Sequence, residues 1–337
     1  MSKQTRRIAT LASVSLAASA ATQTSRAALA LYEPFNYTVA TGLAGVNGQA
    51  LTATGSPVGY TAPNGNQWFS ASYSAHTTTY NQANDALVNA NDLTVAGLDK
   101  PGTSNAVNFG GAGSSPRLAF TSIDNAGDGS ARPAYFSIAF QITDLSATNA
   151  AGGLLAGFNN TRGSQSTNPS TVGAALFVKA SGGGFVMGIL EQGTDATQAT
   201  YDTTVLNLNQ TYFVVGKYTI FGTVNTGGAT PTTDDTAEIW INPLSSTFGG
   251  GDPLGSLIAV NPRSDVPTNL TDGNRTIQTI LLRQGTGNSA TNIVFDELRV
   301  GTTYADVTPV PEPAGLALLG LASAGLLARR RRDTTRD

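Results

Sequence analysis

Acidic side chains on glycine-rich turns are the residues of this chain with the clearest capacity for chemistry. The segment "SIDNAGDGS" (residues 122–130) gathers Asp124, Asn125 and Asp128 between glycines. Oxygen ligands on such a loop suit Ca²⁺, although the spacing is not that of an EF-hand. The turn "TTDDTAE" (residues 232–238) is a second acidic cluster. The sequence therefore predicts a calcium site at Asp124, Asn125 and Asp128, with an ordinary solvated turn as the alternative.

Two adjacent carboxylates occur in the late segment "VFDELRV". Retaining glycosidases need two carboxylates aimed at one sugar, which on a strand requires acidic residues at alternating positions. Adjacent residues point to opposite faces of a strand, so this pair favours a structural role. Asp296 is expected as a partly buried acceptor of backbone or arginine hydrogen bonds, and Glu297 as a partner of Arg299. The expected faces are Val294, Asp296, Leu298 and Val300 on one side, and Phe295, Glu297 and Arg299 on the other.

Other catalytic or binding groups are few. His76 is the only histidine and lies in a polar stretch, and the chain has no cysteine. A cysteine nucleophile and a multi-histidine metal site are therefore excluded, and His76 is interpreted as a surface residue. The aromatic residues that could stack on a sugar are Trp68, Tyr73, Tyr80 and Trp240. For the two tryptophans, which lie in strand-like segments, core packing is the favoured interpretation.

The charge balance restricts the partners of the body. Between residues 31 and 310 there are ten Lys and Arg against 19 Asp and Glu, a net charge of −9. An acidic body argues against binding to nucleic acid and against adhesion to anionic lipid. The basic residues at the two ends of the chain are assigned to targeting segments.

The first 30 residues have the pattern of a secretory signal peptide. Lys3, Arg6 and Arg7 precede a short apolar stretch, and Ala28 and Ala30 form an A-x-A cleavage site. The alternative is a first helix of the folded domain, but the residues of the stretch are too small and too polar to pack well in a core. We therefore predict export through the Sec machinery.

The body reads as β-structure throughout. Apolar residues alternate in "YFSIAFQI" (residues 135–142), "TYFVVGKYTI" (211–220) and "AEIWINP" (237–243). The segment "ALFVKASGGGFVMGIL" (175–190) has the form of a hairpin with a glycine turn. Roughly a dozen short strands joined by turns predict an all-β, two-sheet jelly-roll sandwich. We treat residues 31–309 as one domain.

The body resembles exported bacterial proteins with a concanavalin A/laminin G-like (LamG-like) jelly roll. The resemblance rests on "LYEPFNY" at the start, "DTAEIWINP" in the middle and "NIVFDELRVGTTYADVTP" near the end. It implies that the opening segment pairs with the late strand around "FDELRV". The fold hosts lectins, glycosidases and plain structural modules, so the resemblance names no activity.

The C-terminal segment "VPEPAGLALLGLASAGLLARRRR" (residues 310–332) combines a Pro-Glu-Pro triplet, a 15-residue apolar run and four arginines. The run is shorter than the ~20 residues of a stable membrane span. The order of parts resembles the PEP-CTERM sorting signal, which implies a transmembrane helix over residues 314–328, recognition by exosortase and a five-residue tail (333–337). A permanent tail anchor and a buried helix are the alternatives. The implied sorting residues are Pro311, Glu312, Pro313, Arg329, Arg330, Arg331 and Arg332.

These features together predict an exported, non-enzymatic protein. It is expected to be held transiently in the inner membrane, sorted by exosortase, and delivered to the cell envelope, surface or extracellular matrix. There the sandwich would act as a structural or adhesive component of a biofilm that contacts extracellular polysaccharide (exopolysaccharide). One alternative is a lectin with a defined sugar and Ca²⁺, and another is a polysaccharide-active hydrolase whose site the sequence does not reveal.

Overall fold

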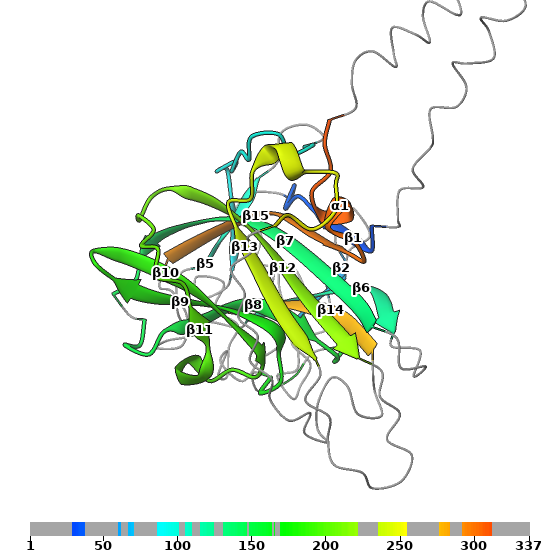
Figure 1. The fold of residues 1–337 in the computed structure, drawn as a ribbon, viewed down its shortest axis with the longest axis horizontal. Coiled ribbons are helices and arrows are strands. Elements are labelled where there is room, and N and C mark those ends of the chain that lie inside the picture. Colours follow the sequence, from blue (N-terminus) through cyan, green and yellow to red (C-terminus); the bar gives the residue numbers. More distant parts are fainter. Residues whose placement is uncertain are drawn as a thin grey trace, which may run out of the picture.

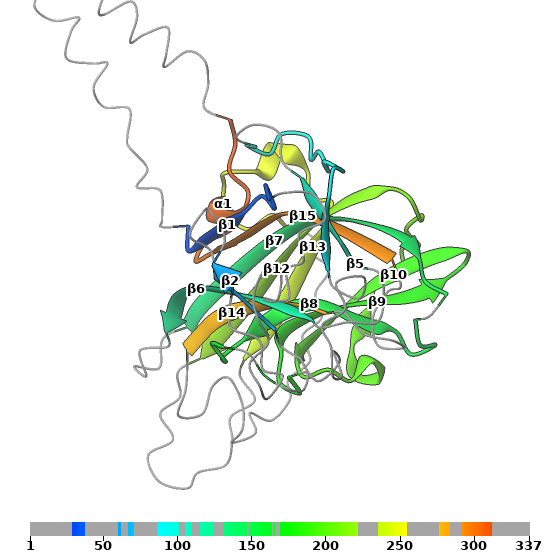
Figure 2. The same ribbon diagram turned by 180° about the vertical axis from the view of Figure 1, so that it is seen from behind.

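The chain forms two antiparallel sheets packed face to face, as Figures 1 and 2 show from opposite sides. The structure is a computed structural model. The residues that it describes are 29–37, 60–61, 67–70, 86–100, 105–109, 115–124, 131–146, 148–163, 165, 169–221, 235–254, 276–283 and 292–311. The predicted all-β, two-sheet sandwich is thereby confirmed.

The first sheet, called sheet A, has seven strands in the order β13-β12-β7-β15-β5-β4, with β1 paired to β15 beside β5. The second, sheet B, has eight strands in the order β11-β10-β9-β8-β14-β6-β3-β2. The bounds in sheet A are β1 (Leu31–Glu33), β4 (Leu87–Asn89), β5 (Ala106–Phe109), β7 (Ala131–Asp144), β12 (Thr211–Phe221), β13 (Thr236–Ile241) and β15 (Asn292–Gly301). Those in sheet B are β2 (Tyr60–Thr61), β3 (Gln67–Ser70), β6 (Pro116–Asp124), β8 (Gly153–Asn159), β9 (Gly173–Ser181), β10 (Gly184–Gln192), β11 (Thr200–Tyr201) and β14 (Thr276–Leu282).

Strict alternation along the strands builds the core between the sheets. The alternating apolar residues of β7, β12 and β13 all lie in this core, because every second side chain of a strand points to the same face. Trp68 on β3 is fully buried there, so its expected packing role is confirmed. The inward residues of the three strands are Phe136, Ile138, Phe140, Ile142, Tyr212, Val214, Tyr218, Ile220, Ile239 and Ile241.

The predicted glycine hairpin joins β9 to β10. Ser181 pairs with Gly184, which leaves Gly182 and Gly183 as a two-residue loop. Both loop residues have positive φ angles, +56° and +84°. This is the geometry of a tight hairpin turn whose twist matches that of the strands, and glycine adopts it without a steric cost.

The opening segment pairs with the late strand, as the resemblance implied. Tyr32 of β1 lies opposite Arg299 of β15, and Glu33 lies opposite Leu298. Glu33 points into the interior, where its carboxylate accepts hydrogen bonds from the Tyr37 hydroxyl and from the Phe35 backbone amide. The Tyr37 hydroxyl in turn accepts a bond from Trp68 Nε1 at 3.2 Å. A buried polar chain thus fixes the start of the domain to the core.

Strand β15 contains a bulge that corrects the faces expected from the sequence. Between the pairs Asp296–Ala139 and Arg299–Ser137, β15 has two residues where β7 has one. Glu297 takes up the extra length with a φ of +54°. Alternation is therefore reset at Glu297, and Asp296 does not share a face with the core residues that follow it. The core receives Phe295, Leu298 and Val300, whereas Asp296, Glu297 and Arg299 form a separate polar cluster outside the core.

A second apolar layer covers the outer face of sheet A. Segment 91–100, the turn with the 3₁₀ helix η4 (Ser245–Thr247) and the helix α1 (Tyr304–Val307) lie over it. In sheet B a smaller outer cluster packs under the 3₁₀ helix η3 (Ala196–Gln198). The outer cluster of sheet A contains Leu93, Leu98, Ala106, Tyr135, Ala139, Phe213, Val215, Trp240, Phe248, Val294, Tyr304 and Val307.

The two targeting segments fall almost entirely outside the described residues. Those residues include 29–30 of the predicted signal peptide and 310–311 of the predicted sorting signal. No helix formed by the described residues has the length and hydropathy needed to cross a membrane. The predicted span at residues 314–328 lies outside them and stays a prediction.

Candidate functional site

The carboxylate of Asp296 is completely buried beneath segment 91–100. Its Oδ2 accepts a hydrogen bond from the Leu93 amide at 3.0 Å and lies 3.2 Å from Lys100 Nζ, and its Oδ1 accepts from the Glu297 amide at 2.7 Å. The predicted backbone acceptor role is confirmed, with lysine in place of arginine as the charged partner. Burial raises the pKa of the Asp296 carboxyl to about 7, against the opposing effect of the Leu93 amide and Lys100.

Glu297 and Arg299 form the predicted pair. Arg299 Nη2 lies 2.7 Å from Glu297 Oε2 and also donates to the Asp99 carbonyl at 2.7 Å. The guanidinium carbon stacks 4.5 Å from the centre of the Tyr32 ring, and the Tyr32 hydroxyl donates to Glu297 at 3.2 Å. Burial and the Glu297 charge raise the pKa of Tyr32. The pair thus connects β1, β15 and segment 91–100.

Lys100 closes this cluster from the outside. It contacts Asp92, lies 3.2 Å from Asp296 Oδ2 and 3.5 Å from Glu297 Oε1. Although burial lowers the pKa of Lys100, the hydrogen bond to Asp92 and the two buried carboxylates outweigh it and raise that pKa. The carboxylates are therefore engaged by lysine, arginine and backbone groups. We interpret the cluster as a structural connection between strands.

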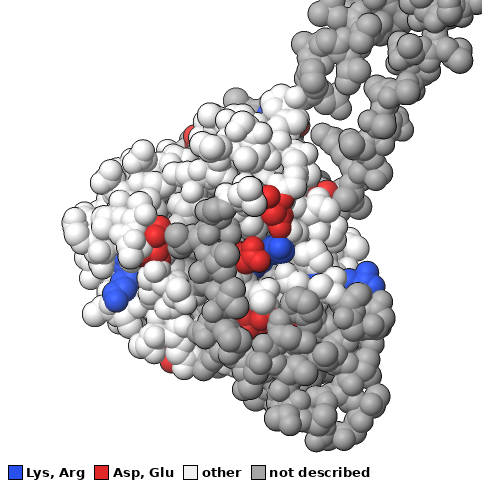
Figure 3. Space-filling model, in the orientation of Figure 1, with Lys and Arg blue, Asp and Glu red and all other residues white. Residues whose placement is uncertain are grey.

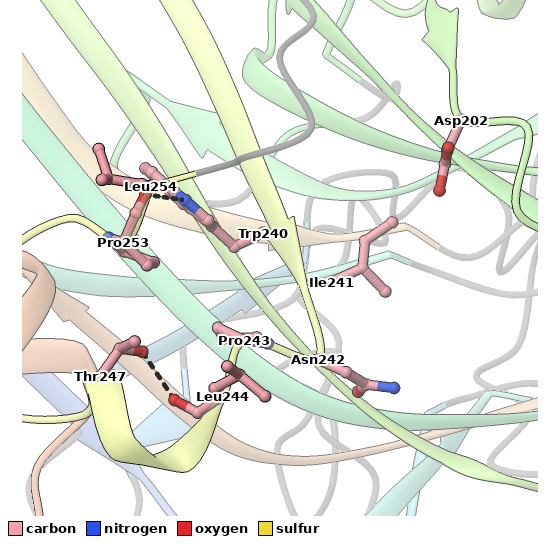
Figure 4. Close-up of a pocket in the computed structure, with 9 residues that line it drawn as sticks. All are labelled: Asp202, Trp240, Ile241, Asn242, Pro243, Leu244, Thr247, Pro253 and Leu254. Carbon is pink, nitrogen blue, oxygen red and sulfur yellow. Dashed lines mark hydrogen bonds between the residues drawn. The ribbon is translucent and has the colours of Figure 1, made fainter.

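A cavity of about 310 Å³ opens beside the end of β13, at the edge of sheet A (Figure 4). Asp202, which follows β11 of sheet B, lines one side, and the exposed Leu244 and Leu254 lie on the other. This volume is at the lower end of the range of small-molecule sites, about 300–1,000 Å³. The lining residues are Asp202, Trp240, Ile241, Asn242, Pro243, Leu244, Thr247, Pro253 and Leu254.

Local backbone features hold the polar groups of this cavity in place. Asn242 has a φ of +48°, and its Oδ1 accepts a hydrogen bond from the Phe213 amide at 2.8 Å. One oxygen of Asp202 accepts from the Thr203 amide at 2.6 Å. Trp240 is buried, and its Nε1 donates to the Pro253 carbonyl at 3.2 Å, so its ring faces are not open to a ligand. Among the lining residues, Asp202 is the one carboxylate.

The remaining predicted residues have varied outcomes. Asp124 ends β6, whereas Asn125 and Asp128 of the predicted calcium site lie outside the described residues, as do Asp234, His76, Tyr73 and Tyr80. Asp235 is buried and accepts a hydrogen bond from the Tyr218 hydroxyl at 2.8 Å, so it serves the core. The described part of the chain contains no group of three or more His, Cys, Asp or Glu that could hold a metal ion. The calcium site stays a prediction.

Sequence reasoning missed the cavity residues Asp202, Asn242, Leu244 and Leu254. A turn signal was present at Asn242-Pro243, because proline cannot continue a central strand. No sequence signal connected that turn with Asp202, since the contact joins the edges of two different sheets.

Thr308 and Pro309, just before the last described residue, Pro311, are hydrogen-bonded to the folded body. The Asp99 amide donates to the Pro309 carbonyl at 2.8 Å, and the Gly249 amide donates to the Thr308 carbonyl at 2.7 Å. Pro311 itself is exposed. Residues 309–332 match the family model described as the PEP-CTERM protein-sorting motif. The chain carries a PEP-CTERM sorting motif. Such a motif implies an exported protein that exosortase sorts to the surface, and the motif begins two residues before Pro311, within the folded body.

Of the sorting residues, Pro311 is the one that the structure describes; Glu312, Pro313 and Arg329–Arg332 fall inside the matched range but outside the described residues. Their individual roles in sorting stay predictions. No match to the chain was found among curated protein sequences.

Several solved structures are similar to this chain at a low level. The alginate lyase Aly36B is 12% identical over 66% of this chain and 84% of its own, with a TM-score of 0.37. An endo-β-1,4-glucuronan lyase from the fungus Trichoderma reesei is 14% identical over 66% and 92%, with a TM-score of 0.32. Domain 4 of AbnA, an extracellular arabinanase from Geobacillus stearothermophilus, is 11% identical over 80% and 98%, with a TM-score of 0.35. Similarity at this level supports no inference about ligand or reaction.

Proposed function

We propose that the protein is a non-enzymatic structural or adhesive component of the cell surface or extracellular matrix. The observation that carries the proposal is the PEP-CTERM motif joined directly to a folded β-sandwich. The body would cross the inner membrane behind a signal peptide, remain anchored transiently by its C-terminal helix, and be released by exosortase. The sandwich would then serve outside the cell, in contact with polysaccharide.

Two features of the site support a non-enzymatic role. The adjacent carboxylates Asp296 and Glu297 are held in ion pairs and backbone hydrogen bonds that connect β15 to its neighbours. The cavity beside β13 presents Asp202 as its carboxylate. Glycoside hydrolysis generally uses a pair of carboxylates flanking the scissile bond.

The sorting part of the proposal predicts a shortened mature protein. Mass spectrometry of the protein recovered from the surface of cells that contain an exosortase should show an N-terminus near residue 31 and a C-terminus that lacks Arg329–Arg332. Deletion of the exosortase should leave the C-terminal segment in place and the protein in the membrane fraction. A surface-exposed chain that still ends at Asp337 in exosortase-containing cells contradicts the proposed processing.

A lectin is the second candidate, and the cavity beside β13 favours it. Asp202 and the amide of Asn242 sit next to apolar side chains, a combination that suits the hydroxyls and C–H faces of a single sugar. The test is a glycan array with competition by free sugar. If the lectin reading is right, D202N should weaken binding about tenfold, because a hydrogen bond to a charged group is lost.

The control variant for that experiment is D195N. Asp195 is exposed, caps the short helix η3 and is not among the residues that line the cavity. Suppose that sugar binding is saturable, is competed by free sugar, is lost in D202N and is retained in D195N. That result favours the lectin over the structural proposal. Turnover of any polysaccharide by the purified protein refutes both non-enzymatic readings.

A further inference from the structure

The lysine and arginine side chains on the outer faces of the two sheets differ in their ion pairing. On the outer face of sheet A, Lys100, Lys217 and Arg299 each lie within ion-pair distance of a carboxylate. Lys217, for example, is 2.9 Å from Asp252 and 3.7 Å from Glu238. Figure 3 shows one face of the molecule, on which several acidic and basic side chains lie side by side. These cations are neutralised by the protein itself.

Four cations lie on the outer face of sheet B. The neighbours Leu118, Val178 and Leu282 point into the core between the sheets, so Arg117, Lys179 and Arg283 point outward by alternation. Arg162, in the turn after β8, is placed on the same face because its Nη2 donates to Gln67 at 3.3 Å and the next residue, Trp68, points inward. Among the described residues, no carboxylate lies within ion-pair distance of any of these four.

The four cations form a row that crosses the strands. Lys179 is on β9, Arg283 directly follows β14, Arg117 is on β6, and Arg162 reaches β3. The sheet order β9-β8-β14-β6-β3 places them across five neighbouring strands. The strand registers also stagger the cations along the strands: Lys179 lies at the start of β8, Arg117 is level with Gly157, and the Arg162 partner Gln67 is level with Asn159. With about 4.8 Å between strands and about 3.3 Å per residue along them, the row is a diagonal roughly 30 Å long.

Arg117 is the buried member of the row and positions an exposed one. Its Nη1 donates to Asn159 at 2.8 Å and to Gln165 at 2.7 Å, and its Nη2 contacts the Gly163 carbonyl. These acceptors are neutral and belong to the end of β8 and the turn that carries Arg162. Its Nε, like that of Arg283, is buried without a hydrogen-bond partner. Burial lowers the pKa of both guanidinium groups to about 10, which leaves them charged at neutral pH.

We propose that the row Lys179, Arg283 and Arg162 on the outer face of sheet B binds a polysaccharide that contains uronic acids. Carboxylates spaced along the sugar chain would pair with cations that have no carboxylate partner among the described residues. Arg162 is exposed and Lys179 and Arg283 are half-buried, so all three offer donors at the surface. Arg117 holds the turn of Arg162 and supplies positive charge from below.

The chemistry of the row favours a carboxylated sugar chain over other anions. A guanidinium presents a planar fork of donors that matches a carboxylate in two parallel hydrogen bonds. A row across the strands requires a ligand with repeated anionic groups, and the net charge of −9 on the whole body opposes a densely charged polyanion such as nucleic acid. The inference deepens the proposed function, and it rests on that function because the ligand must be met outside the cell.

Affinity electrophoresis of the purified protein in gels that contain polygalacturonate tests the proposal. Migration should be retarded by polygalacturonate and unaffected by the neutral polysaccharide dextran. The retardation should weaken strongly between about 50 mM and about 500 mM NaCl, because exposed ion pairs are screened. The triple variant R162Q/K179Q/R283Q should bind at least about tenfold more weakly, since the loss of even one charge-assisted hydrogen bond is worth about that factor.

Control variants distinguish binding by the outer face of sheet B from nonspecific electrostatic attraction. K217Q removes one positive charge from the outer face of sheet A, so it should retain full binding, whereas R162Q alone should lose part of it. Arg162 is exposed and makes its one hydrogen bond to Gln67, so R162Q should melt at the wild-type temperature. Equal losses for K217Q and R162Q overturn the assignment of the face. The choice of ligand is overturned if polygalacturonate does not retard the protein, or if dextran sulfate or DNA retards it as much as polygalacturonate does.

A failure of the polygalacturonate experiment can be distinguished from a failure of the proposed function. Mass spectrometry and cell fractionation test export and sorting without any ligand. A sorted surface protein that ignores polygalacturonate refutes the uronate inference and leaves the structural role standing. A protein that binds polygalacturonate in vitro but is retained inside the cell refutes the proposed function.

Discussion

Replacement of Arg299 by alanine is expected to lower the free energy of unfolding by about 3–5 kcal/mol, because the change leaves a buried carboxylate without its arginine. Arg299 and Glu297 are 2% and 1% exposed at the side chain, so water cannot replace the lost partner. The change also removes the donor to the Asp99 carbonyl and uncovers the Tyr32 ring. Urea unfolding at neutral pH, followed by tryptophan fluorescence and circular dichroism, measures the loss.

The matched control is R162A, which removes an exposed arginine with a single side-chain hydrogen bond. Its effect should stay within about 0.5 kcal/mol, as is usual for surface substitutions. Adding E297Q to R299A should recover part of the lost stability, because the second change removes a buried charge that has lost its closest cationic partner. A loss below about 1 kcal/mol for R299A, or no recovery in the double variant, contradicts the view that this pair is a buried structural connection.

Regular strands were predictable because alternation alone decides which side chains enter the core. In β7, β12 and β13, the alternating apolar residues of the sequence are those that pack between the sheets. In β15 the same rule failed beyond Asp296, because the strand contains a bulge at Glu297. Bulges with a positive φ commonly use glycine, and a glutamate gave no signal there. The bulge is what gathers Asp296, Glu297 and Arg299 into one cluster.

Contacts over long sequence distances were harder to predict than the strands. Segment 91–100 has no hydrophobic period, yet its Leu93 amide and Lys100 side chain both reach Asp296, about 200 residues away in sequence. The cavity brings together Asp202 from the edge of sheet B and Asn242 from the edge of sheet A, and no local sequence pattern predicts which edges of two sheets lie close together. The pairing of β1 with β15 was implied by a resemblance, because three residues of strand carry too little pattern to choose a partner. The sorting motif was readable because it is local and contiguous.

The position of the motif relative to the body gives the structural reason to connect fold and sorting. The Gly249 and Asp99 amides donate to the Thr308 and Pro309 carbonyls, and these bonds hold the chain against the outer face of sheet A up to two residues before the exposed Pro311. A Pro-X-Pro segment is biased to extended backbone, since proline restricts itself and the residue before it. The predicted recognition triplet would therefore begin immediately at the surface of the folded body.

The protein should become more stable as the pH falls from 8 to 5, opposite to the usual behaviour of carboxylates. Burial raises the pKa of Asp296 from 3.8 to about 7 in the folded state. A carboxyl with a raised folded pKa contributes stability that is fully present below the unfolded pKa and is lost as the pH rises through about 7. Three pKa units correspond to ~4 kcal/mol at most, of which about 2–3 kcal/mol falls between pH 8 and pH 5.

The variant D296N should flatten this pH dependence, because an amide does not titrate. Unfolding free energies from urea titrations at pH 5, 6, 7 and 8 give the slope for each protein. D144N is the matched control: Asp144 is partly exposed and its pKa is lowered by hydrogen bonds with Ser146, so its titration lies below this window. H76Q, which replaces the one histidine of the sequence, is run as a second control. A wild-type stability that rises with pH, or a slope that D296N leaves unchanged, contradicts this prediction. It shows that the Asp296 carboxyl stays ionised beneath segment 91–100 because the interaction with Lys100 outweighs the cost of burying the charge.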